Sequence, residues 1–93
     1  MQDTVKVTAA QIEIEWLKPE VNIKKIADVI ERVVKEDKPD LIVFPELSNS
    51  GYLIGREHKD FADFSKRYFK AAERIPGPFT DTLCEHAKKY NLY

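Results

Sequence analysis

The sequence has little cysteine, little glycine and almost no net charge. The one cysteine, Cys84, excludes an intrachain disulfide framework and a cysteine-rich zinc site, so no metal site is expected. The three glycines, Gly51, Gly55 and Gly77, do not have the spacing of a nucleotide-binding loop. A formal net charge of -1 gives no overall attraction for nucleic acid or anionic lipid, and we expect neither a nucleic acid nor a membrane as partner.

Long apolar runs are also absent. The longest is far shorter than the roughly 18 residues that a membrane helix needs. Residues 1–4 lack the basic and apolar blocks of a secretory signal, and we therefore expect a cytoplasmic protein. With 43% hydrophobic and 33% charged residues over 93 positions, the composition is typical of one globular domain or a part of one.

The stretch DLIVFPELSNSGY, from Asp40 to Tyr52, is the most informative part of the chain. Its unbroken apolar run, Leu41–Phe44, predicts a strand buried on both faces. Pro39 and Pro45 confine this strand, because proline cannot donate a hydrogen bond to a sheet ladder. Glu46 follows at the carboxyl end of the strand, which is where ligands bind in open parallel sheets.

The carboxylate of Glu46 has two interpretations that the residues alone leave open. Burial of a carboxylate is costly unless the group is paired or put to use, which favours a functional acid or base. Structural ion pairs with a nearby Lys or Arg also occupy such positions. The polar residues 48–51 supply a turn in either case, and they could line a cleft.

The first half of the chain predicts a strand, a helix and a second strand. Apolar alternation predicts a strand from about Thr4 to Glu15, and a change of face near Ala10 and Gln11 suggests a bulge or burial on both sides there. A helix is expected from about Val21 to Lys35, with Pro19 suited to its first turn. The connection is too long for a hairpin, so the two strands should be parallel with a right-handed crossover.

Two further helices are expected in the second half. The aromatic residues Phe61, Phe64 and Tyr68 recur at helical spacing and favour core packing over a ligand cage. Residues 75–78, IPGP, break this helix, because a residue before proline avoids helical geometry.

The last helix should be capped by Thr80 and should end at Asn91 in a left-handed conformation. Leu92–Tyr93 then resembles the first step of another strand. Two parallel strands with three helices cannot cover both sheet faces or protect the sheet edges. We therefore expect residues 1–93 to be the N-terminal part of a single larger domain, incomplete at its C-terminus.

The motif FPELSNSGY, preceded by a strand-helix-strand unit that begins VKVTAAQ, resembles the nitrilase superfamily of carbon–nitrogen hydrolases. The pair Ala10–Gln11, Asn22 at the start of the first helix, and residues 72–77, AERIPG, agree with this pattern. The resemblance covers essentially the whole chain. It implies an α/β fold, the N-terminal part of an α-β-β-α sandwich, arranged as strand-helix-strand-helix-helix with strands 1 and 2 parallel.

The resemblance also implies a Glu-Lys-Cys triad, in which Glu46 is the catalytic general base. The glutamate would take the proton of a thiol that attacks an amide or nitrile carbon, and would later activate the water that clears a thioester-type intermediate. Partial desolvation of its carboxylate suits proton transfer near neutral pH. The lysine would stabilise the developing negative charge. The implied partners are a small-molecule amide or nitrile substrate and, in the complete enzyme, further copies of the chain in a homo-oligomer. No cofactor is implied.

No residue of this chain matches the motifs of the family's lysine and cysteine, which would lie beyond Tyr93. Cys84 is expected to be a core or core-edge thiol with no adjacent base. Tyr52, after Gly51, is a candidate substrate-binding residue, with packing after a turn as the alternative. The chain alone is therefore expected to be inactive. A non-catalytic α/β scaffold or interaction subunit that retains the Pro-Glu turn is the alternative function, and a flavodoxin-like ligand-binding domain is a weaker one.

Overall fold

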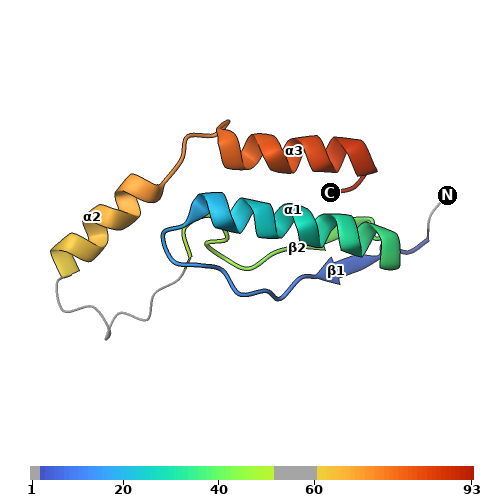
Figure 1. Ribbon diagram of the computed structural model, residues 1–93. Helices are drawn as coiled ribbons and strands as arrows, with labels where there is room; N and C mark the ends of the chain where they lie inside the picture. Colours follow the sequence, from blue (N-terminus) through green and yellow to red (C-terminus); the bar gives the residue numbers. More distant parts are fainter. Residues whose placement is uncertain (1–2, 52–60) are drawn as a thin grey trace.

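The computed structural model describes residues 3–51 and 61–93 (Figure 1). The predicted order of strand, helix, strand, helix and helix is confirmed. The elements are β1 (Val7–Ala9), α1 (Pro19–Glu36), β2 (Leu41–Val43), α2 (Phe61–Ala71) and α3 (Pro78–Tyr90).

The two strands pair in parallel, as the crossover helix between them requires. Val7 lies opposite Leu41 and Ala9 lies opposite Val43. The ladder ends where the backbone N–H of Ala10 donates to Val43 O at 2.8 Å. Both strands are shorter than predicted, because β2 turns away at Pro45 and leaves residues 11–15 extended without a partner in the ladder.

The last residue of the chain pairs with the free edge of β2. Tyr93 N donates to Asp40 O at 2.9 Å, and Ile42 N donates to Tyr93 O at 2.8 Å. One residue that bonds to two positions of its neighbour in this way is the pattern of a parallel ladder. The predicted start of a further strand at Leu92–Tyr93 is thus confirmed, and β2 lies between β1 and this new strand.

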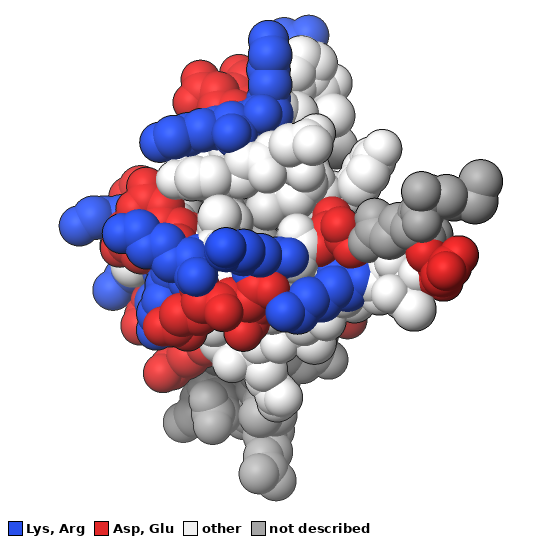
Figure 2. Space-filling view, turned by 90° about the vertical axis from the view of Figure 1, so that its right-hand side faces the viewer, with Lys and Arg blue, Asp and Glu red and all other residues white. Residues whose placement is uncertain are grey.

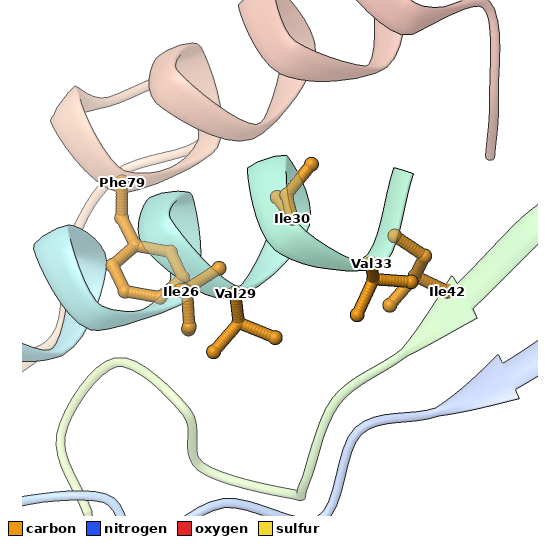
Figure 3. Packing of buried hydrophobic residues seen from close by; sticks show 6 residues of the cluster. All are labelled: Ile26, Val29, Ile30, Val33, Ile42 and Phe79. Carbon is orange, nitrogen blue, oxygen red and sulfur yellow. The ribbon is translucent and has the colours of Figure 1, made fainter. Parts of the chain in front are cut away.

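Helix α1 is the centre of the hydrophobic core. It begins at Pro19, two residues before the predicted start, because proline is accommodated where the helical N–H groups have no partner. Its apolar stripe packs against β2 and α3, and both helices lie on one side of the strands (Figure 1). Phe79 points from α3 toward Ile26, and Ile42 of β2 lies beside Val33 (Figure 3). The buried hydrophobic residues are Ile26, Val29, Ile30, Val33, Ile42 and Phe79.

The opposite face of the sheet is exposed, which corrects two expectations. Val7 is 53% exposed and Val43 is 49% exposed, so β2 is buried on one face and not on both. The reason is that no described helix or strand covers that side (Figure 1). The segment after β1 has neither a bulge nor two-sided burial, since Ile12 and Ile14 simply pack against the core while Gln11 is exposed.

The start of α3 also differs from the prediction. Gly77 is the N-cap, and Thr80 lies in the first turn, where its hydroxyl accepts a hydrogen bond from Gly77 N at 2.9 Å. Glu73 caps the same turn, because its Oε1 accepts a bond from Phe79 N at 2.9 Å. The predicted left-handed stop at Asn91 is confirmed by its φ of 52°.

The charged residues lie on the surface, with both signs interspersed. Lys, Arg, Asp and Glu side chains alternate over the face that Figure 2 shows, and no broad area carries one sign. None of the helices among residues 3–51 and 61–93 is long and apolar enough to cross a membrane.

Replacement of Ile26 by Ala should lower the free energy of unfolding by about 2–5 kcal/mol, because it leaves a cavity in the centre of the core. Val7→Ala, on the exposed face of the sheet, is the matched control and should cost less than about 1 kcal/mol. Urea unfolding followed by circular dichroism measures both values. Equal losses in the two variants would contradict this description of the core.

Candidate functional site

Glu46 stands just beyond the carboxyl ends of the parallel strands. β2 ends at Val43, and the turn of residues 46–50 begins after Pro45. A hollow of about 220 Å³ lies at these strand ends, and Pro45, the residue before Glu46, is one of the residues that line it. The hollow is lined by Ala9, Ala10, Gln11, Val43, Phe44 and Pro45. The structure therefore places Glu46 just beyond the strand ends, as the sequence predicts, and directly after Pro45 of the hollow.

The carboxylate of Glu46 is exposed, and no hydrogen bond or ion pair joins it to another described residue. A structural ion pair with a Lys or Arg, the first alternative for this residue, is thus not seen in the described part of the chain. The expected partial desolvation is not seen either. Among the described residues the hollow is lined only by residues 9–11 and 43–45, so it is open to solvent on one side.

The turn that carries Glu46 is held by the side chain of Asn22, which is fully buried at 0% exposure. Its Nδ2 donates to Glu15 O at 2.8 Å and to Asn49 O at 2.8 Å, and its Oδ1 accepts from Glu15 N at 2.7 Å. These three bonds join the extended segment after β1, the first turns of α1 and the turn after β2. Each of them links residues at least seven positions apart.

Gly51 closes the turn where two backbone segments meet. Its φ is +80°, and a Cβ at this position would lie 2.6 Å from Glu15 O and 2.8 Å from the Cα of Trp16. Only glycine satisfies both conditions, because other residues strain at such a φ and their Cβ would clash with backbone atoms. Next to it, Leu17 N donates to Ser50 O at 2.7 Å. The turn is therefore pressed against residues 15–17 along its second half.

Helix α2 also contacts this turn. The Tyr68 hydroxyl donates to Gly51 O, and Asn49 Nδ2 lies 3.4 Å from Ala71 O. The Tyr68 ring is tilted against the ring of Trp16, with the centroids 6.4 Å apart. Packing, and not ligand binding, thus explains Tyr68, as its spacing predicts. Tyr52, the candidate substrate-binding residue, lies outside the described residues.

The other candidate side chains do not meet Glu46. Cys84 is exposed on α3, which corrects its predicted core-edge position. The inward face of α3 is formed by Leu83 and Ala87, and Cys84 falls on the solvent side of that face. His86 Nδ1 lies 2.8 Å from Thr82 O, one turn back along the same helix. The described residues contain no group of three His, Cys, Asp or Glu side chains that could hold a metal ion.

Comparison with known families identifies the family of the chain. The carbon-nitrogen hydrolase family matches residues 6–93. The chain belongs to the carbon-nitrogen hydrolase family. The match includes both strands, the turn with Glu46 and all three helices of this family member. It confirms the resemblance drawn from the FPELSNSGY motif.

The sequence predicts Glu46 but not the residues that hold it. Asn22 is noticeable because asparagine is a weak helix former, and it lies in the first turns of an otherwise amphipathic helix. This signal indicates that Asn22 makes polar contacts, but it does not indicate which residues it contacts. The partners, Glu15 and Asn49, are backbone groups in two irregular segments, and no local pattern predicts their approach.

Gly51→Ala should lower the free energy of unfolding by about 1–3 kcal/mol, because φ is strained and the new Cβ meets the Glu15 and Trp16 backbone. Asn91→Ala also places alanine at a positive φ, but at the exposed end of α3, and it should cost only about 1 kcal/mol. Thermal unfolding of both variants measures this. A smaller loss for Gly51→Ala than for Asn91→Ala would refute the close approach.

Proposed function

We propose that this chain supplies the general base, Glu46, of a hydrolase that cleaves non-peptide carbon–nitrogen bonds in amides or nitriles. The observation that carries the proposal is the position of Glu46 beyond the ends of parallel strands. Its carboxylate has no partner among the described residues, and it follows Pro45, which lines the hollow of residues 9–11 and 43–45. Family membership supports the bond class, since the carbon-nitrogen hydrolase family matches residues 6–93.

In the proposed reaction Glu46 moves a proton in each half of the cycle. Its carboxylate takes the proton of a cysteine thiol, and the sulfur forms a bond to the amide carbon. The carboxylic acid then returns the proton to the leaving amine as the carbon–nitrogen bond breaks, which leaves a thioester. Glu46 next takes a proton from water as the water oxygen bonds to the thioester carbon. It passes that proton to the sulfur as the carbon–sulfur bond breaks, which releases the acid and restores the thiol.

A lysine and the cysteine complete the proposed triad, and both are proposed to lie outside residues 1–93. The proposal thus treats the chain as the N-terminal part of one hydrolase domain within an α-β-β-α sandwich. The lysine would donate hydrogen bonds to the oxygen or nitrogen that gains negative charge. The proposed substrate is a small amide or nitrile, the complete enzyme is proposed to be a cytoplasmic homo-oligomer, and no cofactor takes part.

The exposure of Glu46 has a place in this proposal. Glu46 is exposed, and no described element covers the apolar sheet face with Val7 and Val43. Burial of a few apolar side chains of this size is favourable by roughly 1.5–3 kcal/mol each. The remaining part of the domain would cover this face, enclose the hollow and desolvate the base.

Glu46→Gln in the complete domain should leave folding unchanged and lower kcat by about 100-fold or more, because the amide cannot accept the thiol proton. Glu36→Gln is the control, since it removes an exposed carboxylate at the end of α1 and should keep full activity. Ammonia release from a panel of amides and nitriles measures both. Normal turnover by Glu46→Gln would show that the base is misassigned and would favour the non-catalytic scaffold.

The 93-residue chain alone should not turn over any amide or nitrile, because one residue of the proposed triad is present. The same ammonia assay on the purified chain, compared with Glu46→Gln in the same chain, tests this. Release that depends on Glu46 in the isolated chain would show that a nucleophile lies within residues 1–93.

A further inference from the structure

Asn22 is the deepest polar side chain of the described part of the chain. It is 0% exposed, and it is the fourth residue of α1. An amide buried in this way is costly unless its donors and acceptor are all bonded. Both N–H groups and the Oδ1 of Asn22 are bonded to backbone atoms, so this cost is offset only while the partner segments stay in place.

The partners of Asn22 belong to two segments that are far apart in the sequence. Glu15 belongs to the extended segment that leaves β1, and Asn49 belongs to the turn after β2. Neither segment is part of a regular element, so no helix or ladder hydrogen bonds fix its position. The side chain of Asn22, which is carried by helix α1, supplies hydrogen bonds that hold both segments.

The turn itself transmits this restraint to Glu46. The Ser48 hydroxyl donates to Pro45 O, and Gly51 N donates to Leu47 O at 2.7 Å. These bonds make residues 45–51 one closed unit, and Glu46 lies three positions before Asn49 within it. A displacement of Asn49 therefore moves the backbone that carries the Glu46 carboxylate.

We propose that Asn22 is a positioning residue that sets where the turn of residues 45–51, and hence Glu46, stands relative to the strand ends. The restraint on the turn is a property of this chain by itself. The consequence for catalysis rests on the proposed function of Glu46. Aspartate cannot replace Asn22, since it keeps the acceptor for Glu15 N but turns a charged oxygen toward two carbonyl oxygens.

Amide hydrogen exchange in the 93-residue chain tests the restraint by NMR. The measured quantity is the exchange rate of Gly51 N–H in the turn divided by that of Leu41 N–H, which donates to Lys6 O at the start of the β1–β2 ladder. Asn22→Leu, which has a similar size and no polar group, should raise this ratio about tenfold or more, because each carbonyl left unpaired weakens the turn locally. Val33→Ala, in the core away from the turn, should raise both rates and leave the ratio unchanged.

An unchanged ratio in Asn22→Leu would overturn the proposal. Asn22→Asp is the second variant, because it preserves the bond from Glu15 N and the shape of the side chain, and it should also raise the ratio. Loss of the whole fold in both Asn22 variants, while Val33→Ala stays folded, would overturn the proposal too. Asn22 would then stabilise the chain as a whole and would not position the turn.

Kinetics of the complete domain separates this inference from the proposed function. Asn22→Asp should lower kcat roughly 10- to 100-fold with little change in KM, since a misplaced base weakens the chemical step and not substrate binding. Val33→Ala should keep the kcat of the parent at temperatures where it is folded. If the exchange ratio is raised in Asn22→Leu but Glu46→Gln keeps full activity, the proposed function is refuted and the positioning role of Asn22 stands. If the exchange ratio is unchanged in Asn22→Leu and Glu46→Gln is inactive, the positioning role is refuted and the proposed function stands.

Discussion

The contact on which the site depends is the meeting of two irregular backbone segments, residues 15–17 and 49–51. They touch because Gly51 has no Cβ, and they stay together because the amide of Asn22 bonds to both. Each segment follows a short strand, and neither has regular hydrogen bonds of its own. A buried, fully bonded polar group specifies one arrangement, because any other arrangement leaves it unsatisfied. The position of Glu46 follows from this contact.

Described elements pack on only one face of the strands that lead to this contact. Helix α1 packs on β2 and α3, while the face with Val7 and Val43 has no cover among the described elements (Figure 1). The same asymmetry explains the open hollow beside Glu46 and the free edge at which Tyr93 begins to pair with β2. The chain thus presents a carboxylate, a concave wall and an apolar face in one region. In the proposed function, that region is where the rest of the domain packs.

Local signals in the sequence predict much of this architecture. The apolar stripe of α1, the left-handed Asn91 and the strand start at Tyr93 each follow from residues that are close together in the chain. The prediction that β2 is buried on both faces is wrong. An apolar run shows that burial is favourable, but it does not show which element covers each face of the strand. The role of Asn22 is not predictable, since its bonds join positions 15, 22 and 49 through backbone atoms that carry no sequence signature.

The most direct test of this account is a crystal structure of the complete domain with a substrate-derived acyl group on its nucleophile. The account predicts that the Glu46 carboxylate lies within about 2.6–3.2 Å of the nucleophilic sulfur or of the water that attacks the acyl carbon. It also predicts that Asn22 still bonds to Glu15 and Asn49 there. A Glu46 side chain turned to solvent, with another residue in contact with the sulfur, would contradict it.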